Sequence, residues 1–328
     1  MTTETGGLSE MGCRNKYYIG FDLGGSSLKY GYGNKEKGLL FSDKIYHQTY
    51  SSNGVPAVES IESRGADLPS LITTFRTAFT HLSKQHKHFK ALGLASPGVI
   101  DTANGIVLGS TPNLPYIKNV NLKDILHDIT HLPIFIENDA NLMTFAEAMH
   151  WESDSTLGIT LGSGIGTGFV HQNSIFSGTK YLAMEAGHTI VMPNGRTCLC
   201  GKKGCLEAYS SADSIVRIIS EIFPYKNKLN IEEIIRSDNP AIKKVLNEIL
   251  ELLAISLSNL VMVLNPDTVV IGGGVIEIDG FDFEYLKSNI LNHLTSEFRD
   301  INIQKAYYKN TSGVMGAILY SENNFNLL

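Results

Sequence analysis

The 328-residue sequence predicts an α/β fold made of two domains. The chain is long enough for two substantial hydrophobic cores. Strand-like and helix-like segments alternate along most of it, as in sheets covered by helices. One arrangement also occurs twice: a strand, a glycine-rich turn and a second strand at residues 17–33, and again at residues 156–170. A half repeat of this kind indicates two similar domains.

Composition excludes several classes of protein. Hydrophobic residues make up 43% of the chain and charged residues 18%, and we find no apolar run long enough to cross a bilayer, so we expect a soluble protein without a membrane partner. The net charge of −6 argues against a nucleic-acid partner, because a polyanion needs concentrated Lys and Arg. Residues 1–15 lack the apolar core of a signal peptide and should form a mobile tail. Four cysteines suit a reducing cytoplasm.

The first structured segment is an aromatic and β-branched strand at residues 17–21, which enters a glycine turn. The turn reads Asp22-Leu-Gly24-Gly25-Ser26-Ser27-Leu-Lys29. Backbone N–H groups in such a turn can approach a phosphate, and the serine hydroxyls add donors. Taken alone, Asp-x-Gly-Gly could equally be an ordinary hairpin turn.

Strands are expected next at residues 28–33, 39–50 and 91–95, with a helix at residues 68–88 before the last of them. His86 and His88 at the basic end of this helix are more typical of a solvated end than of a metal pair, because their side chains diverge. The segment at residues 111–115, which contains Asn113, is too rich in proline for a helix or a central strand.

A helix at residues 121–130 precedes a continuous apolar strand at residues 132–136, which is typical of a parallel sheet. The strand runs into Glu137-Asn138-Asp139-Ala140-Asn141, and a helix follows at residues 142–149. In open α/β sheets ligands bind beyond the carboxyl ends of strands, so Asn138 and Asp139 are candidate site residues. Either side chain could instead merely cap the following helix.

The second glycine turn lies within residues 156–170 and contains Thr160, Gly162, Ser163 and Gly164. Two such turns, each offering N–H groups, are what two domains closing on one triphosphate require. As a dinucleotide fingerprint the pattern is weak, because a strand rather than a helix follows it.

Three cysteines and an upstream histidine form the most specific pattern in the chain. Cys198, Cys200, Cys205 and His188 are the ligand types, in the number, that a closed tetrahedral zinc site uses. Gly201 and Gly204 would let the chain double back, because glycine accepts left-handed backbone angles freely. A disulfide with one spare thiol, or free core cysteines, is the alternative.

The remaining chain predicts helices at residues 212–223 and 231–236, and a longer helix that Asn239 caps and Asn265 ends. A strand at residues 268–271 then enters a third glycine turn, Gly272-Gly273-Gly274, which alone could be a tight connection. A helix at residues 282–298, a strand at 301–307 and a helix at 312–321 complete the prediction.

The run Glu185-x-Gly-His188, followed by Cys-x-Cys-Gly-x-x-Gly-Cys-x-Glu207, resembles the signature of the ROK family of sugar kinases and related repressors. This resemblance implies two ribonuclease H-like, actin-like ATPase domains flanking a cleft. It assigns residues 16–117 plus 301–328 to a smaller domain, which the C-terminal strand and helix complete. Residues 118–300 would form a larger domain that carries the zinc loop.

The resemblance also implies roles for individual residues. Asp139 would be the general base, and Asp22 would lie near Mg²⁺. A structural Zn²⁺ would be held by His188, Cys198, Cys200 and Cys205. The hexose contacts would be Asn113, Asn138, Asp139, Glu185, His188 and Glu207. The ATP contacts would be Asp22, Gly24, Gly25, Ser26, Ser27, Lys29, Thr160, Gly162, Ser163, Gly164, Gly272, Gly273 and Gly274.

The expected activity is ATP-dependent phosphorylation of a hexose at its 6-hydroxyl, with glucose as the first choice of substrate. N-acetylmannosamine or N-acetylglucosamine is the alternative acceptor, and a non-catalytic sugar sensor is the alternative class. A repressor is not expected, because only 21 residues precede Asp22, too few for a DNA-binding domain. Family likeness further implies a homodimer.

Overall fold

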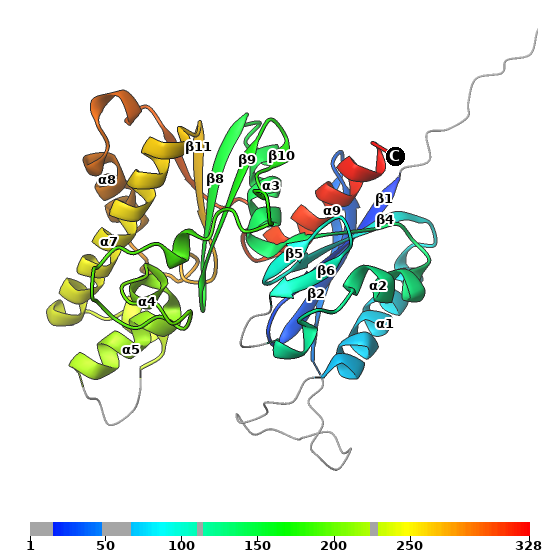
Figure 1. Ribbon diagram of the computed structural model, residues 1–328, viewed down its shortest axis with the longest axis horizontal. Helices are drawn as coiled ribbons and strands as arrows, with labels where there is room; N and C mark the ends of the chain where they lie inside the picture. Colours follow the sequence, from blue (N-terminus) through cyan, green and yellow to red (C-terminus); the bar gives the residue numbers. More distant parts are fainter. Residues whose placement is uncertain (1–15, 48–66, 110–113, 224–228) are drawn as a thin grey trace, which may run out of the picture.

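The computed structural model describes residues 16–47, 67–109, 114–223 and 229–328. Two five-stranded sheets lie on either side of a central pair of helices, α3 and α9 (Figure 1). These two sheets with their helices confirm the predicted two-domain α/β architecture. Three predicted features lie outside the described residues: the tail at residues 1–15, the end of the strand beyond residue 47, and Asn113.

The first sheet has the strand order β3-β2-β1-β4-β7. Its strands are β1 (Tyr17–Leu23), β2 (Ser27–Asn34), β3 (Gly38–Tyr46), β4 (Phe89–Ser96) and β7 (Ile134–Asn138). β1, β2 and β3 pair antiparallel, whereas β1, β4 and β7 pair parallel. The carboxyl ends of the three parallel strands therefore meet at one edge, where a ligand site can form.

Two helices and a small hairpin complete this half. α1 (Leu68–Gln85) begins at Asp67, whose side chain accepts a hydrogen bond from the backbone N–H of Ser70, and its buried side chains join those of β1 and β4 in one core. α2 (Leu122–Thr130) packs beside α1. The hairpin of β5 (Val99–Asp101) and β6 (Ile106–Gly109) has no counterpart in the sequence prediction.

The second sheet repeats the first. Its order is β10-β9-β8-β11-β12, with strands β8 (Ser155–Leu161), β9 (Ile165–His171), β10 (Ser174–Ile175), β11 (Thr268–Gly272) and β12 (Asn302–Lys305). β8, β9 and β10 are antiparallel, and β8, β11 and β12 are parallel. The half repeat read from two glycine turns thus extends to both whole sheets.

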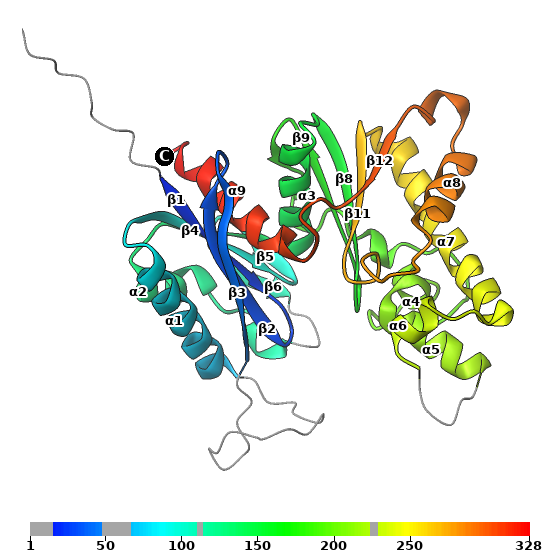
Figure 2. The same cartoon turned by 180° about the vertical axis from the view of Figure 1, so that it is seen from behind.

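Helices cover the outer face of the second sheet, as Figure 2 shows from behind. α7 (Pro240–Leu264) and α8 (Phe283–His293) bury Leu253, Leu257 and Leu286 in one core with β8 and β11. Three shorter helices lie near the N-terminal half of α7. They are α4 (Glu207–Ser210), α5 (Ala212–Ile222) and α6 (Ile231–Ile235).

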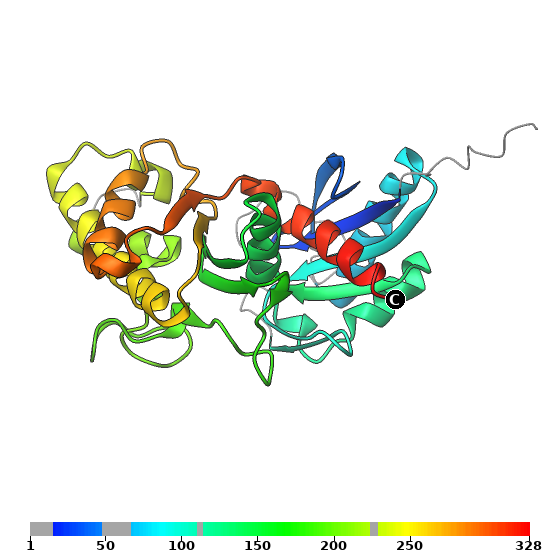
Figure 3. The ribbon, with the colours of Figure 1, turned by 90° about the horizontal axis from the view of Figure 1, so that it is seen from above.

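α3 (Asp139–His150) and α9 (Ser312–Phe325) connect the two halves (Figure 3). α3 leaves β7 of the first sheet and packs on β8 and β9 of the second, whereas α9 follows β12 and packs back on β1 and β4. A Cβ atom on Gly93 would lie 1.9 Å from the carbonyl oxygen of Ala317, so glycine is required for this close approach. The last helix therefore packs on the first sheet.

A buried carboxylate on α3 holds the segment that connects β12 to α9. Glu147 on α3 accepts hydrogen bonds from the backbone N–H groups of Tyr307 and Tyr308, at 2.9 and 3.0 Å, and from the indole of Trp151 at 3.2 Å. Burial raises the pKa of Glu147, and these hydrogen bonds oppose the rise. The segment between β12 and α9 is therefore tied to α3, where the two halves meet.

The sheet pairing corrects the predicted domain division at two places. The prediction put residues 118–138 in the larger domain, but β7 pairs with β4 of the first sheet. It put residues 301–307 in the smaller domain, but β12 pairs with β11 of the second sheet. Pairing between strands far apart in sequence decides membership, and no local signal encodes it. The predicted helices at 68–88 and 282–298 also end earlier, at Gln85 and His293.

The expectation that no apolar run could cross a bilayer also needs correction. α7 is long and apolar enough to do so by length and composition alone. Its residues Ile249, Leu253 and Leu257 are buried inside the protein. The core helix of a soluble protein passes the same test, so this helix is weak evidence for a membrane span.

Candidate functional site

The junction between β7 and α3 shows which residue caps the helix. Asn138 occupies the N-cap position, and its Oδ1 accepts hydrogen bonds from the N–H groups of Ala140 and Asn141, at 2.9 and 3.2 Å. Its Nδ2 donates to the carbonyl of Gly98 at 3.1 Å. Asp139 is the first helical residue, and its Oδ1 lies 2.9 Å from the N–H of Ala140. Because Asn138 is the N-cap residue, helix capping alone does not explain Asp139.

Glu137 stabilises this junction through two hydrogen bonds, a role that the sequence analysis missed. Its side chain is buried, and Oε1 accepts hydrogen bonds from the backbone N–H of Asn138 at 2.8 Å and from Nδ2 of Asn141 at 3.0 Å. Burial raises its pKa, and both hydrogen bonds oppose this. A glutamate that ends an apolar strand was the available signal, because a buried carboxylate needs such partners.

Three carboxylates gather at this edge of the first sheet. The pKa of Asp139 is raised to about 7, first by burial, then by the negative charge of Asp22 and, more weakly, by that of Glu185. Asp22 is the last residue but one of β1, whereas Glu185 comes from the second half, just before the short helix η2 (Ala186–His188). Nζ of Lys29 lies 3.3 Å from Asp22 Oδ2. Oxygen ligands with excess negative charge are what Mg²⁺ prefers, so Asp22 and Asp139 fit a divalent cation.

The first glycine turn is braced at both ends by His47, another residue that the sequence analysis missed. The Nε2 of His47 lies 3.0 Å from the carbonyl of Gly24, and its backbone N–H donates to the carbonyl of Ser26 at 3.0 Å. Since a carbonyl only accepts, Nε2 carries the proton. Gly25 and Ser26 remain exposed between these contacts, so the turn can offer its backbone to a phosphate.

The second and third glycine turns lie side by side in the other half. A Cβ atom on Gly273, whose φ is +98°, would lie 2.4 Å from the carbonyl oxygen of Leu161, and Val275 N–H donates to that oxygen at 3.1 Å. Ser163 and Gly274 are exposed at the two turns. The structure therefore brings residues 160–164 and 272–274 together, as a shared nucleotide site would require.

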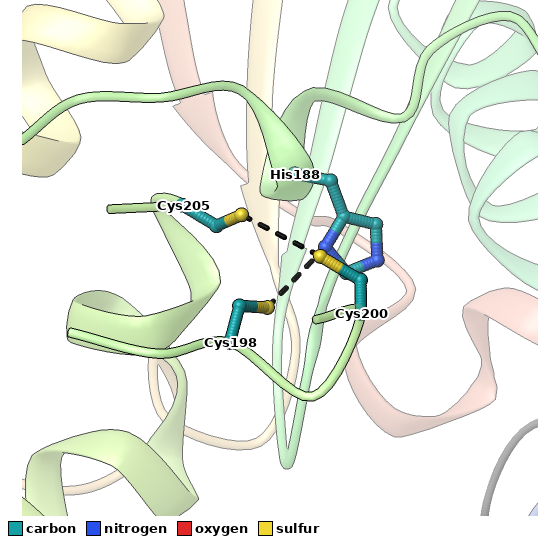
Figure 4. A group of neighbouring side chains, drawn as sticks. All are labelled: His188, Cys198, Cys200 and Cys205. Carbon is teal, nitrogen blue, oxygen red and sulfur yellow. Dashed lines mark hydrogen bonds between the residues drawn. The ribbon is translucent and has the colours of Figure 1, made fainter. Parts of the chain in front are cut away.

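The four predicted metal ligands converge, as Figure 4 shows. Their ligand atoms all lie within 4.8 Å of one another. The Sγ atoms of Cys200 and Cys205 are 3.6 Å apart, and Sγ of Cys198 is 3.6 Å from Nδ1 of His188. Two sulfur ligands about 2.3 Å from a tetrahedral zinc lie about 3.8 Å apart, so the arrangement fits zinc closely.

The chemistry of the thiols agrees with this fit. Cys198 and Cys205 are buried, and Cys200 is exposed. Burial raises the pKa of the Cys198 thiol to about 12. A thiolate at this position therefore needs a compensating cation at neutral pH, and a bound metal supplies one. We call His188, Cys198, Cys200 and Cys205 the metal knot.

Glu207 joins the metal knot to the second glycine turn. Its Oε2 accepts a hydrogen bond from the backbone N–H of Ile165 at 3.0 Å, and its Oε1 lies 3.8 Å from Sγ of Cys198 and 4.0 Å from Nδ1 of His188. Glu207 also lines a cavity of about 530 Å³, together with Ser163 and α5 residues such as Arg217. The knot, the turn and this cavity thus form one connected region.

Two glycines between Cys200 and Cys205 allow a matched test of how the chain packs around the metal knot. Gly201 and Gly204 both have positive φ, +86° and +83°, so alanine is strained at either position. At Gly204 the added Cβ would also lie 1.9 Å from the carbonyl oxygen of Met192, whereas at Gly201 no atom of the described residues beyond the chain neighbours lies within 4 Å. We expect Gly204→Ala to lower zinc content and melting temperature clearly more than Gly201→Ala, as measured by elemental analysis and thermal unfolding. Equal effects would mean that the contact with Met192 is unimportant.

Comparison with known proteins agrees with this geometry. A model described as "ROK family" matches residues 18–323. The chain belongs to the ROK family. It is 30% identical to a glucokinase of Thermotoga maritima, over 85% of this chain and 89% of that protein. It is 29% identical to an N-acetyl-D-glucosamine kinase of Vibrio atlanticus, over 92% of this chain and 98% of that protein.

A solved ROK structure has the same fold. The ROK family glucokinase from Streptomyces griseus, in complex with glucose and AMPPNP, superposes with a TM-score of 0.77 at 24% identity, over 94% of this chain and 99% of that one. The two similar sheets of this ROK protein are therefore its two actin-like ATPase domains. Of the predicted site residues, Asp22 and Glu185, from different halves, both act on the charge of Asp139, whereas Asn113 is outside the described residues.

Proposed function

We propose that this ROK protein transfers the γ-phosphoryl group of ATP to the 6-hydroxyl of a hexose, with glucose as the first candidate acceptor. The curated relatives named glucokinase and N-acetyl-D-glucosamine kinase support this class of reaction. The observation that carries the proposal is the position of Asp139. It lies at the carboxyl end of β7, next to the helix cap and in the field of Asp22 and Glu185.

In this proposal Asp139 accepts the proton of the attacking hydroxyl, while Asn113, Asn138, Glu185, His188 and Glu207 orient the sugar. The side chain of Asn138 already makes its cap and Gly98 contacts, so it contributes more to the position of Asp139 than to sugar contacts. Phosphoryl transfer needs little covalent chemistry from the protein. The main contributions are alignment of the hydroxyl and exclusion of water, which is a competing acceptor.

The glycine turns at residues 24–27, 162–164 and 272–274 bind the nucleotide through backbone N–H groups, assisted by Lys29 and Thr160. Asp22 holds Mg²⁺, which when bound neutralises part of the phosphate charge. The metal knot holds a structural Zn²⁺, which fixes the ring of His188 and the chain around Glu207 without taking part in the reaction. Elemental analysis of the purified protein should find about one zinc per chain.

The pKa of Asp139 predicts how turnover depends on pH. A general base must be ionised, and the pKa of this carboxyl is raised to about 7. We therefore expect kcat/KM for the hexose to fall about tenfold for each pH unit below 7 and to reach a plateau above it. A bound cation favours the ionised form, so the kcat profile should bend at a lower pH. A pH profile that is flat from 5 to 8 would contradict this assignment.

A coupled assay of ATP consumption with a panel of hexoses tests the proposed activity. Fastest turnover of glucose supports the first candidate, and fastest turnover of N-acetylglucosamine or N-acetylmannosamine supports the alternative acceptor. Sugar binding without turnover of any hexose would overturn the kinase proposal in favour of a sugar sensor. NMR of the product, through the coupling between its phosphorus and the protons on carbon 6, distinguishes the 6-phosphate from its isomers.

A homodimer, which rests on family likeness, and a cytoplasmic location, which rests on the cysteine content, complete the proposal. Light scattering combined with size-exclusion chromatography should give twice the chain mass of 35.9 kDa. A mass of one chain at micromolar concentration would remove the dimer from the proposal. This result would leave the proposed reaction untouched, because the site residues considered above all belong to one chain.

A further inference from the structure

The carboxylate of Asp22 lies against the first turn of the last helix. A Cβ atom built on Gly313 would lie 2.5 Å from Cγ of Asp22, and 2.7 and 2.8 Å from its two oxygens. On its other side the carboxylate meets Nζ of Lys29, 3.3 Å from Oδ2. The side chain of Asp22 therefore lies between Lys29 of β2 and Gly313 of α9, and 16% of its surface remains exposed.

Backbone conformation does not explain why glycine occurs at position 313. Gly313 lies inside α9, and its φ is not in the left-handed region. Within a helix glycine is less favourable than alanine, so the local structure would gain from a side chain. The close approach of Asp22 does explain it, because even a methyl group would overlap the carboxylate.

The second glycine of α9 has a different neighbour. A Cβ atom on Gly316 would lie 2.1 Å from the backbone carbonyl oxygen of Leu142 on α3. Backbone cannot move aside, so Gly316 serves the packing of α9 on α3. The three atoms nearest to a Cβ on Gly313 all belong to the side chain of Asp22, which can rotate away. Substitution of Gly313 should therefore affect the site residue Asp22, whereas substitution of Gly316 should affect the packing of α9 on α3.

We propose that Gly313 is a positioning residue, which lets the last helix hold the Asp22 carboxylate in the orientation that receives the divalent cation of the nucleotide. This inference rests on the proposed function. The start of α9 favours the same orientation. No side-chain hydrogen bond from Thr311 caps this helix, and the positive end of a helix dipole stabilises an ionised carboxylate. The C-terminal helix thus completes a site that the first strand begins.

The test is Gly313→Ala, with Gly316→Ala as the matched control. Titration calorimetry with MgADP should show an affinity lowered by about 10- to 100-fold in Gly313→Ala. This is the usual range when a residue that positions a metal ligand is replaced. The Mg²⁺ concentration for half-maximal turnover should rise by a similar factor, with KM for the hexose unchanged. The melting temperature without ligand should not fall. Gly316→Ala should instead lower the melting temperature and leave the affinity for MgADP at the wild-type value.

A double-mutant cycle checks that Gly313 acts through Asp22. In an Asp22→Asn background, Gly313→Ala should produce no further loss of MgADP affinity, because its target is already gone. If Gly313→Ala alone fails to fold, the double variant Asp22→Ser, Gly313→Ala should restore folding by removing the overlap. Failure of this rescue, or wild-type MgADP affinity in a folded Gly313→Ala protein, would overturn the inference. If the wild-type protein binds no MgADP, the proposed function itself fails and the inference with it.

Discussion

Replacement of Asp139 by asparagine should lower kcat by about 10²- to 10⁴-fold, the range that general-base catalysis contributes. Asparagine is nearly isosteric with aspartate, and Asn138 rather than Asp139 occupies the cap position of α3. The variant should therefore fold, with KM values for ATP and hexose changed little. The measurement is the coupled assay under saturating substrate. Asp128→Asn, an exposed carboxylate on α2, is the matched control and should keep full activity.

The same variant should be more stable than the wild-type protein at high pH. The pKa of Asp139 is raised to about 7 in the folded protein, from 3.8 in a solvated carboxyl. Between these values the folded state binds more protons than the unfolded state, so this group lowers stability as pH rises from about 4 to 7. Asparagine cannot ionise. The melting temperature of Asp139→Asn should match that of the wild type near pH 4 and exceed it at pH 8.

These two readouts separate a catalytic base from a structural aspartate. A variant with near-normal turnover would remove Asp139 from the mechanism. A variant that is inactive but less stable at pH 8 would mean that the charge is compensated in the folded protein, and the environment described for this carboxyl would be wrong. Loss of turnover together with a gain in stability is the outcome expected of a functional site.

Loss of one metal ligand should lower activity by a similar factor, through loss of the bound zinc rather than loss of the general base. Cys205 is fully buried, and its backbone forms an isolated antiparallel bridge with Ile190. We expect Cys205→Ser to reduce bound zinc from one per chain to a small fraction. Without the metal, His188 and Glu207 lose their fixed positions, so kcat/KM for the hexose should fall by more than about 100-fold. Elemental analysis and steady-state kinetics measure the two effects.

Controls distinguish metal loss from general damage. Cys13→Ser removes the one cysteine outside the metal knot and should keep both zinc and activity. Treatment of wild-type protein with a strong chelator should reproduce the Cys205→Ser phenotype, and added zinc should reverse it. Full activity in a zinc-free protein would show that the knot has no part in sugar binding.

The sequence alone predicted the two-domain α/β class and most helix and strand positions, because these depend on local periodicity and on turn residues. Asn239 and Asn265 do begin and end α7 as predicted. The spacing of Cys198, Cys200 and Cys205 predicted the metal knot for a similar reason. Three ligands within eight residues and two glycines form a nearly local unit, which brings the cysteines together with little help from the rest of the chain.

Tertiary structure alone decided the remaining features, because they depend on contacts between residues far apart in sequence. The sheets that β7 and β12 join are set by pairing with β4 and β11, which local sequence does not encode. The bracing of the first glycine turn by His47 and the overlap that excludes a side chain at Gly313 are visible only once the chain has folded. The raised pKa of Asp139 has the same origin, because burial and the charges of Asp22 and Glu185 act through space. The sequence determined which groups the site contains, and the packing of distant segments determined their charge and orientation.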